Sequence, residues 1–401
     1  MSGLAVFHSD YAEHLREALA AHDAGIPTFL GNPQWGEAEM REAARQIPAG
    51  VNVAGKGPVP VGLGPCDWHL GWAGRIMIPS GGTGGRIKFI IHDVNTLRAA
   101  ARSLRDALVG QGFSPTLNCA IVTPPWHVSG LMPAIRARET SGAFAVLNGR
   151  FTPDEPLPSV PLPTSGTRIL SLVPTQLSRL LGMTAGANWL RQFDVILLGG
   201  SSLPSPLRER IGALRLPVYV TYGMTETAAA CALCPPKLVW SKAELRGSPL
   251  PDVRFHASNG LLQISTPALG RGIWPNLPLE QPYLTSDRGD IGSDGTIKVH
   301  GRADQVILTG GEKVNPSRVE HAFLASGIIS EVKVFGRPDA TWGEAVTACV
   351  VGDPAIEAAL RNIADTLEPA ARPKQYVFVA SLPTDERGKF DRSAVLAKLK
   401  T

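Results

Sequence analysis

The 401-residue sequence lacks several features that mark out large classes of protein. No apolar run approaches the roughly 20 residues that a membrane-spanning helix needs. The first ten residues have neither the basic start nor the apolar core of a secretion signal. Lysine and arginine form no block and the net charge is only +4, which argues against nucleic-acid binding but suits small anionic ligands. The five scattered cysteines fit a reducing compartment, so we expect a cytoplasmic protein.

The expected secondary structure indicates an α/β protein of more than one domain. Up to about residue 250 strands alternate with helices, which favours parallel strands in layers. We expect strands at 26–30, 74–79, 88–91, 168–173, 193–198 and 217–221, and helices at 10–22, 175–182 and 205–214, with a further helix from the Asp93 cap through Leu108. Beyond residue 250 the strands are short, and Asn315 caps a helix at 316–326. We therefore expect a large layered α/β domain over residues 1–303 and a small α+β domain over residues 304–401.

Cys231 and Cys234 have the spacing of half a zinc site. A structural zinc ion takes four ligands, and neither a second cysteine pair nor nearby histidines accompany this pair. The better interpretation is two thiols in a packed segment.

A glycine-rich segment, Ser-Gly-Gly-Thr-Gly-Gly-Arg-Ile-Lys at residues 80–88, stands between two expected strands. Because glycine has no Cβ, the backbone N–H groups of such a loop can converge on an anion. Ser80 and Thr83 add hydroxyl donors, and Arg86 and Lys88 add positive charge. The segment is a candidate phosphate-binding loop, although a plain hairpin turn has the same composition.

Three further segments hold residues that suit a nucleotide. Gly199 and Gly200 follow an expected strand and would let a flat ring lie on the backbone, although they also suit a tight strand-to-helix turn. Glu226 follows the next strand beside hydroxyl groups, where a carboxylate suits Mg²⁺ bound to phosphate or caps the following helix. Asp287 could accept hydrogen bonds from ribose hydroxyls or only occupy a turn.

Three segments of the chain, in this order, resemble the motifs of the adenylate-forming acyl-CoA ligase superfamily. They are Tyr-Gly-Met-Thr-Glu-Thr at 222–227, Gly-Arg-Ala-Asp at 301–304 leading into 310–316, and Pro-Thr-Asp-Glu-Arg-Gly-Lys-Phe-Asp-Arg at 383–392. The resemblance covers residues 28–401. It implies an enzyme that uses ATP and Mg²⁺ to convert a carboxylic acid to an acyl-adenylate and then forms a thioester with coenzyme A. It also implies the superfamily's fold with a trimmed N-terminal part, because the glycine-rich segment comes much earlier than in full-length relatives.

The same resemblance implies a role for each residue of the nucleotide site. Glu226 holds Mg²⁺, Thr225 contacts the phosphate, and Tyr222 packs on adenine. Asp287 and Arg302 bind the ribose. The other ATP-binding residues are Ser80, Gly82, Thr83, Gly85, Lys88, Gly199, Gly200, Ser201, Ser202, Gly223 and Met224.

The C-terminal motifs imply a domain that moves between two half-reactions. Asp304 matches the superfamily's hinge, and Gly310 and Gly311 would face the tunnel for the pantetheine arm of coenzyme A. Lys389 would be catalytic, with its point charge on the carboxylate and the α-phosphate. Taken without its neighbours, Lys389 would pass for an ordinary solvated lysine.

The segment 124–132 resembles the Pro-x-x-His-x-Ser-Gly-Leu pattern of the short, cyanobacterial-type o-succinylbenzoate–CoA ligases, which serve menaquinone or phylloquinone synthesis. The implied acyl-binding residues are Trp126, His127, Ser129, Gly130 and Arg136. Arg136 follows His127 by nine residues and could pair with the unreacted carboxylate of a diacid, although a surface arginine is equally compatible with the sequence. No aspartate lies between residues 124 and 138, which disfavours an amino-acid substrate.

Two alternatives keep the superfamily but change the function. The acid could be another aryl or fatty acid, or the chain could bind nucleotide without catalysis. The presence of Glu226, Asp287, Arg302 and Lys389 together argues against the second alternative.

Overall fold

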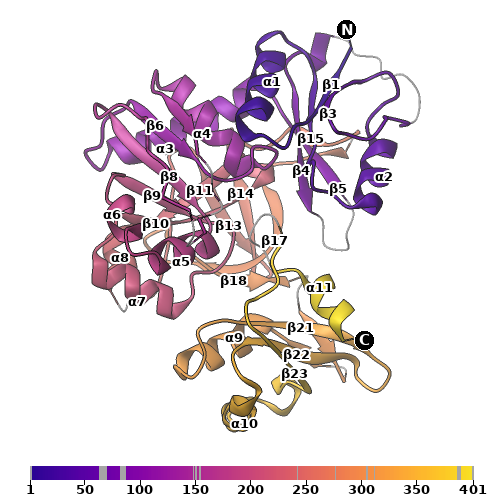
Figure 1. The fold of residues 1–401 in the computed structure, drawn as a ribbon, viewed down its shortest axis with the longest axis vertical. Helices are drawn as coiled ribbons and strands as arrows, with labels where there is room; N and C mark the ends of the chain where they lie inside the picture. Colours follow the sequence, from indigo (N-terminus) through magenta and orange to yellow (C-terminus); the bar gives the residue numbers. More distant parts are fainter. Residues whose placement is uncertain are drawn as a thin grey trace.

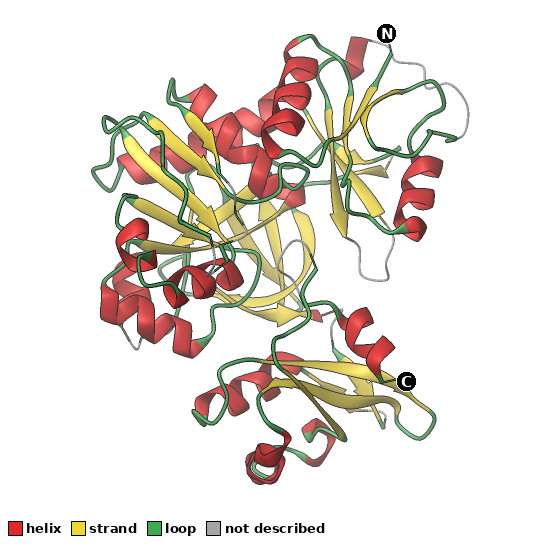
Figure 2. Ribbon diagram, viewed as in Figure 1, coloured by secondary structure: helices red, strands yellow, loops and turns green. Residues whose placement is uncertain are grey.

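The structure is a computed structural model that describes residues 2–62, 70–81, 87–147, 149, 151–152, 155–241, 243–275, 277–303, 306–310, 312–385 and 390–399. Figure 1 shows a large body, which holds the N-terminus, and a smaller body that holds the orange-to-yellow end of the chain. Figure 2 shows that both bodies consist of strands with helices packed on them.

The first sheet is mixed and lies at the N-terminal side of the large body (Figure 1). Its strands run in the order β16 (Leu277–Pro278), β15 (Gly272–Ile273), β5 (Ile87–His92), β4 (Ile76–Gly81), β2 (Thr28–Leu30), β1 (Leu4–Phe7) and β3 (Asn52–Gly55). Strands β1 to β4 pair in parallel, whereas β4 and β5 form an antiparallel hairpin. Helices α1 (Tyr11–Asp23) and α2 (Glu37–Gln46) connect its first strands.

The second sheet is parallel at its centre. Its order is β12 (Ser248–Pro249), β11 (Ala229–Cys234), β10 (Val218–Met224), β9 (Val195–Leu198), β8 (Thr167–Leu172), β6 (Leu117–Ile121) and β7 (Phe144–Val146). Strands β6 to β10 pair in parallel, and β11 and β12 add an antiparallel edge. The connecting helices are α3 (Val94–Val109), α4 (Val128–Glu139), α5 (Pro174–Gly182), α6 (Gly186–Leu190), α7 (Ser205–Leu214) and α8 (Pro236–Trp240).

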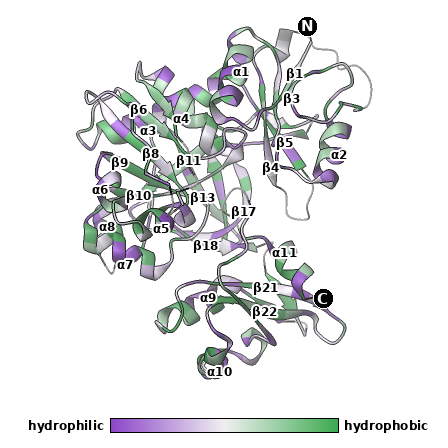
Figure 3. Ribbon diagram, in the orientation of Figure 1, coloured by the Kyte–Doolittle hydropathy of each residue, from purple (hydrophilic) through white to green (hydrophobic). Residues whose placement is uncertain are grey.

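Both faces of the second sheet are buried, because alternate side chains on a strand point to opposite faces. Leu170 and Ile196 pack into a core with α5 to α8, whereas Ile169 and Leu197 pack into a second core with α3. A third core joins α1, α3 and α4 to the first sheet. Figure 3 accordingly shows hydrophobic residues along the strands and mixed hydropathy along the helices.

A smaller antiparallel sheet completes the large body. Its strands are β13 (Arg254–Ser258), β14 (Leu261–Ser265), β17 (Tyr283–Ile291) and β18 (Ile297–Arg302). Strand β18 ends at Arg302, just before the predicted boundary between the two domains; Asp304 itself lies outside the described residues.

The small body has its own sheet and its own core. The sheet contains β20 (Glu312–Val314), β19 (Ile307–Thr309), β22 (Gly343–Val351) and β21 (Val332–Asp339), and β23 (Gln375–Val379) pairs with β22. Helices α9 (Pro316–Ala325), α10 (Glu357–Ala364) and α11 (Arg392–Lys398) pack on it. Asn315 caps α9 as predicted, since its side-chain oxygen accepts a hydrogen bond from the Ser317 N–H. The residues that follow β23, up to Asp385, run up from the small body toward the large one (Figure 1).

The predicted fold class is confirmed: layered α/β sheets precede a small α+β region. The prediction of parallel layers holds for the sheet centres, but both large sheets end in antiparallel strands. In the described part of the chain, no helix combines the length and the apolar character needed to cross a membrane.

The cysteines of the described part are free and buried: Cys119, Cys231, Cys234 and Cys349. Among the described residues, no group of three or more histidine, cysteine or acidic side chains is arranged to hold a metal ion. Burial raises the pKa of Cys119 and Cys231 to about 12 and that of Cys234 and Cys349 to about 11. The pair at 231 and 234 therefore consists of packed thiols on β11.

The raised pKa values predict slow alkylation of these four cysteines in the folded protein at pH 8, because the reactive species is the thiolate. Iodoacetamide labelling, followed site by site by peptide mass spectrometry, should be low in native protein and complete after unfolding in guanidinium. Fast native labelling of Cys231 or Cys234 would contradict the assignment. Protection that persists in denaturant and disappears with a chelator would indicate bound zinc instead.

Candidate active site

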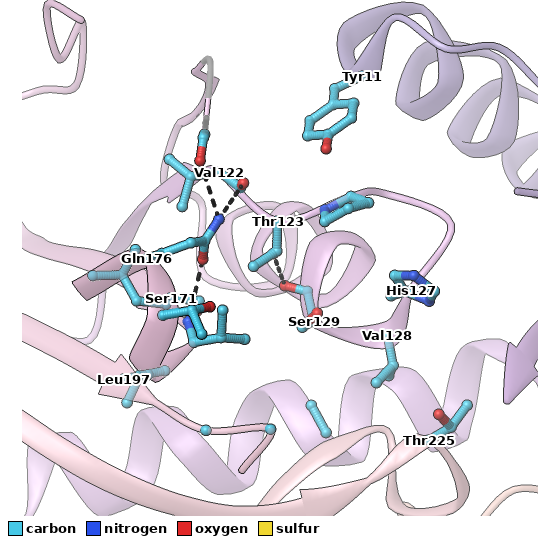
Figure 4. A pocket seen from close by; sticks show the side chains of 18 of the residues that line it. Tyr11, Val122, Thr123, His127, Val128, Ser129, Ser171, Gln176, Leu197 and Thr225 are labelled. Carbon is cyan, nitrogen blue, oxygen red and sulfur yellow. Dashed lines mark hydrogen bonds between the residues drawn. The ribbon is translucent and has the colours of Figure 1, made fainter. Parts of the chain in front are cut away.

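A cavity of about 830 Å³ lies where the parallel strands of the second sheet end. Its wall includes residues that directly follow β6, β8 and β9, and the end of β10. Residues 9–12, at the start of α1, close it on another side. Figure 4 shows Tyr11, His127, Gln176 and Thr225 arranged around this space. The cavity is thus lined by residues of the first and second sheets and of the segments that connect them.

The structure brings many of the predicted site residues to this cavity. Those that line it are Ser80, His127, Ser129, Arg136, Gly199, Gly200, Gly223, Met224 and Thr225. From the small body, Thr384 and Asp385 join the lining; both belong to the 383–392 motif that contains the predicted catalytic Lys389. Lys389 and the residues Gly82, Thr83, Gly85, Asp304 and Gly311 lie outside the described residues.

Other predicted residues do not line the cavity. They are Lys88, Trp126, Gly130, Ser201, Ser202, Tyr222, Glu226, Asp287, Arg302 and Gly310. Lys88 is exposed on β5 and is the register partner of Ser80 across the β4–β5 hairpin. Ser201 and Ser202 are exposed just beyond β9. Gly310 lies in the small body, where a Cβ would meet the Trp342 ring at 3.1 Å.

Trp126, which the sequence predicts to bind the acid, does not line the cavity in this structure. Trp126 is 0% exposed and belongs to the core formed with α1 and the first sheet. Its ring packs edge-on against Tyr11 and His14, with centroids 5.3 and 5.4 Å apart. Trp126 therefore supports the wall from behind, and Tyr11 presents the aromatic surface to the cavity (Figure 4).

The start of α4 is fixed by close packing rather than by a side-chain cap. His127 occupies the N-cap position, and the Thr123 hydroxyl donates to the Ser129 carbonyl at 2.9 Å. Gly130 has no room for a side chain, since a Cβ would lie 2.2 Å from the Pro124 carbonyl oxygen. Gly130 thus serves packing, which lets His127 and Ser129 reach the cavity from the same turn.

Arg136 lies on the buried part of α4 and lines the cavity, with only 4% of its surface exposed. Its side chain makes no hydrogen bond or ion pair with any other residue that the structure describes, and its Nε is buried without a partner. Burial lowers the pKa of Arg136, but an arginine keeps its charge at any ordinary pH. The sequence was equally compatible with an arginine on the surface, and the burial of Arg136 rules that alternative out.

The turn that carries Thr225 and Glu226 is held by hydrogen bonds to the carbonyl groups of these two residues. It is a short 3₁₀ turn, Thr225–Thr227, directly after β10. The Thr225 carbonyl accepts from the His92 ring at 2.8 Å, and the Glu226 carbonyl accepts from the Gly270 N–H at 2.8 Å. A single carboxylate such as Glu226 fits Mg²⁺, which keeps waters and phosphate oxygens as its other ligands.

Asp287 lies behind the cavity in a network of three strands. The Tyr222 hydroxyl donates to Asp287 Oδ2 at 2.6 Å, and Arg302 Nη1 lies 3.9 Å from Asp287 Oδ1. Burial first, and then Asp287, raise the pKa of Tyr222 well above its usual range, so the phenol keeps its proton. Burial and the charge of Glu226 raise the pKa of Tyr283 to about 12. These contacts bring the predicted ribose and metal residues into one neighbourhood, with Tyr222 oriented by Asp287.

Backbone geometry explains two of the glycines. A Cβ on Gly223 would lie 1.8 Å from the Ala229 carbonyl oxygen, across the β10–β11 hairpin. Gly200 has a φ of +88°, in the left-handed region that glycine favours. Both positions lie on the cavity wall, so the backbone itself forms this surface.

Sequence reasoning missed several residues of the site. Gln176 on α5 is held by bonds to the Val122 and Gly149 carbonyls and the Val173 N–H (Figure 4). A glutamine two residues after a helix start gives no signal of this kind. The bond from His92 to Thr225 joins residues 133 positions apart, which no local pattern predicts.

Comparison with known proteins agrees with this architecture. The sequence matches the AMP-binding enzyme family over residues 74–259 and the AMP-binding enzyme C-terminal domain over residues 318–389. A probable 2-succinylbenzoate–CoA ligase of Mycobacterium tuberculosis H37Rv is 31% identical to it, over 80% of this chain and 84% of the relative.

Two solved structures share the fold. One is o-succinylbenzoate CoA synthetase from Bacillus subtilis with an acyl-adenylate intermediate, at a TM-score of 0.74, 20% identity, 100% of this chain and 88% of that chain. The other is ATP-bound MatB from Rhodopseudomonas palustris, at a TM-score of 0.76, 22% identity, 100% of this chain and 89% of that chain. The chain belongs to the AMP-binding enzyme family.

Proposed function

We propose that this chain is an acid–CoA ligase that activates o-succinylbenzoate with ATP and transfers the acyl group to coenzyme A. In the first step a carboxylate oxygen of the acid bonds to the α-phosphorus of ATP and pyrophosphate leaves. In the second the thiol sulfur of coenzyme A bonds to the acyl carbon, its proton goes to solvent, and AMP leaves. Family membership supports the nucleotide chemistry, and the name of the M. tuberculosis relative supports the choice of acid.

The buried guanidinium of Arg136 is the observation that carries the choice of acid. No described residue neutralises it. Its titratable neighbour Cys119 is a neutral thiol at pH 7, because burial raises the pKa of that thiol to about 12. A buried charge left without its partner costs about 3–5 kcal/mol. An acid with a second, unreacted carboxylate would supply that partner.

The position of Arg136 along α4 favours a compact diacid. Arg136 lies eight residues after Val128, the first residue of α4, or about 12 Å along the helix axis. Long side chains on a helix point back toward its N-terminus, where His127 and Ser129 border the cavity. In o-succinylbenzoate a ring and a short chain separate the two carboxylates, which suits a span of this size.

The nucleotide is proposed to lie along the ends of β9 and β10. Gly199, Gly200 and Gly223 offer bare backbone to a flat ring, and Thr225 offers a hydroxyl to phosphate. Asp287 and Arg302 would hold the ribose from β17 and β18. Mg²⁺, when bound at Glu226, would neutralise part of the charge on the phosphates.

Lys389 is proposed to complete the site for the first step only. Thr384 and Asp385, which precede Lys389 in the sequence by five and four residues, line the cavity from the small body. A lysine there would stabilise the charge that develops between the carboxylate and the α-phosphate. Rotation about Asp304 would then withdraw Lys389 and bring Gly310 and Gly311 to the site for thioester formation.

Arg136→Ala should lower kcat/KM for o-succinylbenzoate by about two to three orders of magnitude, because the distal carboxylate loses its partner. Monocarboxylic aryl and fatty acids, which present no second charge, should lose far less. Initial rates of pyrophosphate release, measured across a panel of acids, test this. Arg138→Ala is the matched control, since Arg138 lies on the same helix but is exposed and pairs with Asp23 at 2.5 Å.

The same panel separates the alternatives. Equal losses for diacids and monoacids in Arg136→Ala would make Arg136 structural and leave a ligase for another acid. Absence of pyrophosphate release with every acid, in a protein that still binds ATP, would indicate a nucleotide-binding relative without catalysis.

Lys389→Ala should abolish acyl-adenylate formation but spare thioester formation from supplied acyl-adenylate and coenzyme A. The physical reason is that Lys389 is proposed to meet the α-phosphate only in the adenylating arrangement. Quenched-flow detection of the adenylate and chromatographic detection of the thioester measure the two steps separately. An unchanged rate of adenylate formation would refute the role of Lys389.

Tyr222→Phe should raise KM for ATP about five- to tenfold, because Asp287 loses the hydroxyl that fixes its carboxylate, an effect of about 1 kcal/mol. KM for the acid should change little. The matched control is Tyr219→Phe on the same strand, where the hydroxyl bonds Gln111 at 2.9 Å. Equal effects of the two changes on KM for ATP would argue against a ribose role for Asp287.

A further inference from the structure

His92 links two parts of the active site that are far apart in the sequence. It is the last residue of β5, the strand that returns from the glycine-rich segment, and it is 0% exposed. Its Nε2 lies 2.8 Å from the Thr225 carbonyl oxygen, and its Nδ1 lies 3.0 Å from the Thr96 hydroxyl. Neither His92 nor Thr96 lines the cavity, so His92 acts on the site only through the turn at 225–227.

The direction of these two hydrogen bonds follows from chemistry. Burial lowers the pKa of His92 to about 4, so the ring is neutral at pH 7 and has a single N–H. A carbonyl oxygen can only accept, so Nε2 carries the hydrogen and donates to Thr225. Nδ1 is then the acceptor and faces the Thr96 hydroxyl. The Thr96 hydroxyl, on α3, thus orients the imidazole ring, and the oriented ring donates to the Thr225 carbonyl directly after β10.

The backbone is strained directly after the turn that receives this bond. Ala228 and Ala229 have φ values of +50° and +82°, which residues other than glycine rarely adopt. Such a conformation persists only where the surroundings fix it. Here the Thr225 carbonyl accepts from His92 and from the Ala228 N–H at 3.1 Å, and the Glu226 carbonyl accepts from Gly270. Of these three donors His92 is a side chain, whereas Ala228 and Gly270 donate through their backbone N–H groups.

We propose that His92 is a positioning residue for adenylation, which holds the Thr225 hydroxyl and the Glu226 carboxylate in place for the phosphates of ATP and their Mg²⁺. This inference rests on the proposed function. The bond also ties the end of β5, in the first sheet, to the turn that follows β10 in the second sheet. A fixed position of Thr225 and Glu226 favours reaction at the α-phosphorus.

The test compares two substitutions of nearly equal length, His92→Gln and His92→Met. Only glutamine can donate to the Thr225 carbonyl, so His92→Gln should retain most of the adenylation rate. His92→Met should lose about 10- to 100-fold in kcat for pyrophosphate release and need more Mg²⁺ for half-maximal rate. Thioester formation from supplied acyl-adenylate and coenzyme A should stay at the parent rate in both variants.

Several outcomes would overturn the inference. One is a folded His92→Met protein, judged by its thermal melt, with parental adenylation and Mg²⁺ dependence. Another is a parallel fall of both half-reactions, or no difference between Gln and Met, which would leave His92 a purely structural residue. If His92→Met does not fold, His92→Asn replaces it, because asparagine is polar but too short to reach Thr225. A parent protein that forms no acyl-adenylate would instead refute the proposed function.

Discussion

The parallel pairing of β6, β8, β9 and β10 is the constraint on which the cavity depends. Parallel strands end at the same edge of a sheet, so the chain that leaves each strand enters the same space. Each of these strands delivers a residue to the cavity one or two positions after its end: Thr123, Val173, Gly199 and Thr225. Because helices bury both faces of the sheet, this edge is where polar groups of the strands' ends can meet a ligand.

The parts of this arrangement that sequence could predict are those set by local chemistry. The helix after Asp93 and the helix after Asn315 both begin with a side-chain cap, and both form as expected. His127 occupies the N-cap position of α4 and Arg136 lies on the same helix, nine residues later. Their relative position therefore depends on local helix geometry alone. The fold class followed from the alternation of strands and helices, which depends on residues close in sequence.

The parts that sequence could not predict depend on which partner a side chain finds. Trp126 and His127 are adjacent and were assigned to the acid together, but packing against Tyr11 and His14 takes Trp126 into the core. Tyr222 was assigned to adenine through its ring, and the bond from its hydroxyl to Asp287 on another sheet was not predicted. His92 gave no signal at all, because its partner is a backbone carbonyl and a carbonyl is present at every residue.

The buried charge of Arg136 has a consequence for the stability of the chain itself. Selectivity for a second carboxylate needs a desolvated cation, and until a ligand arrives that cation weakens the fold that surrounds it. A leucine at the same place would remove the unpaired charge and, on the proposed function, give a more stable and less discriminating protein. On the proposed function, the middle of α4 gives up stability for selectivity, and a thermostabilising design that treats Arg136 as a defect would remove the group proposed to distinguish one acid from another.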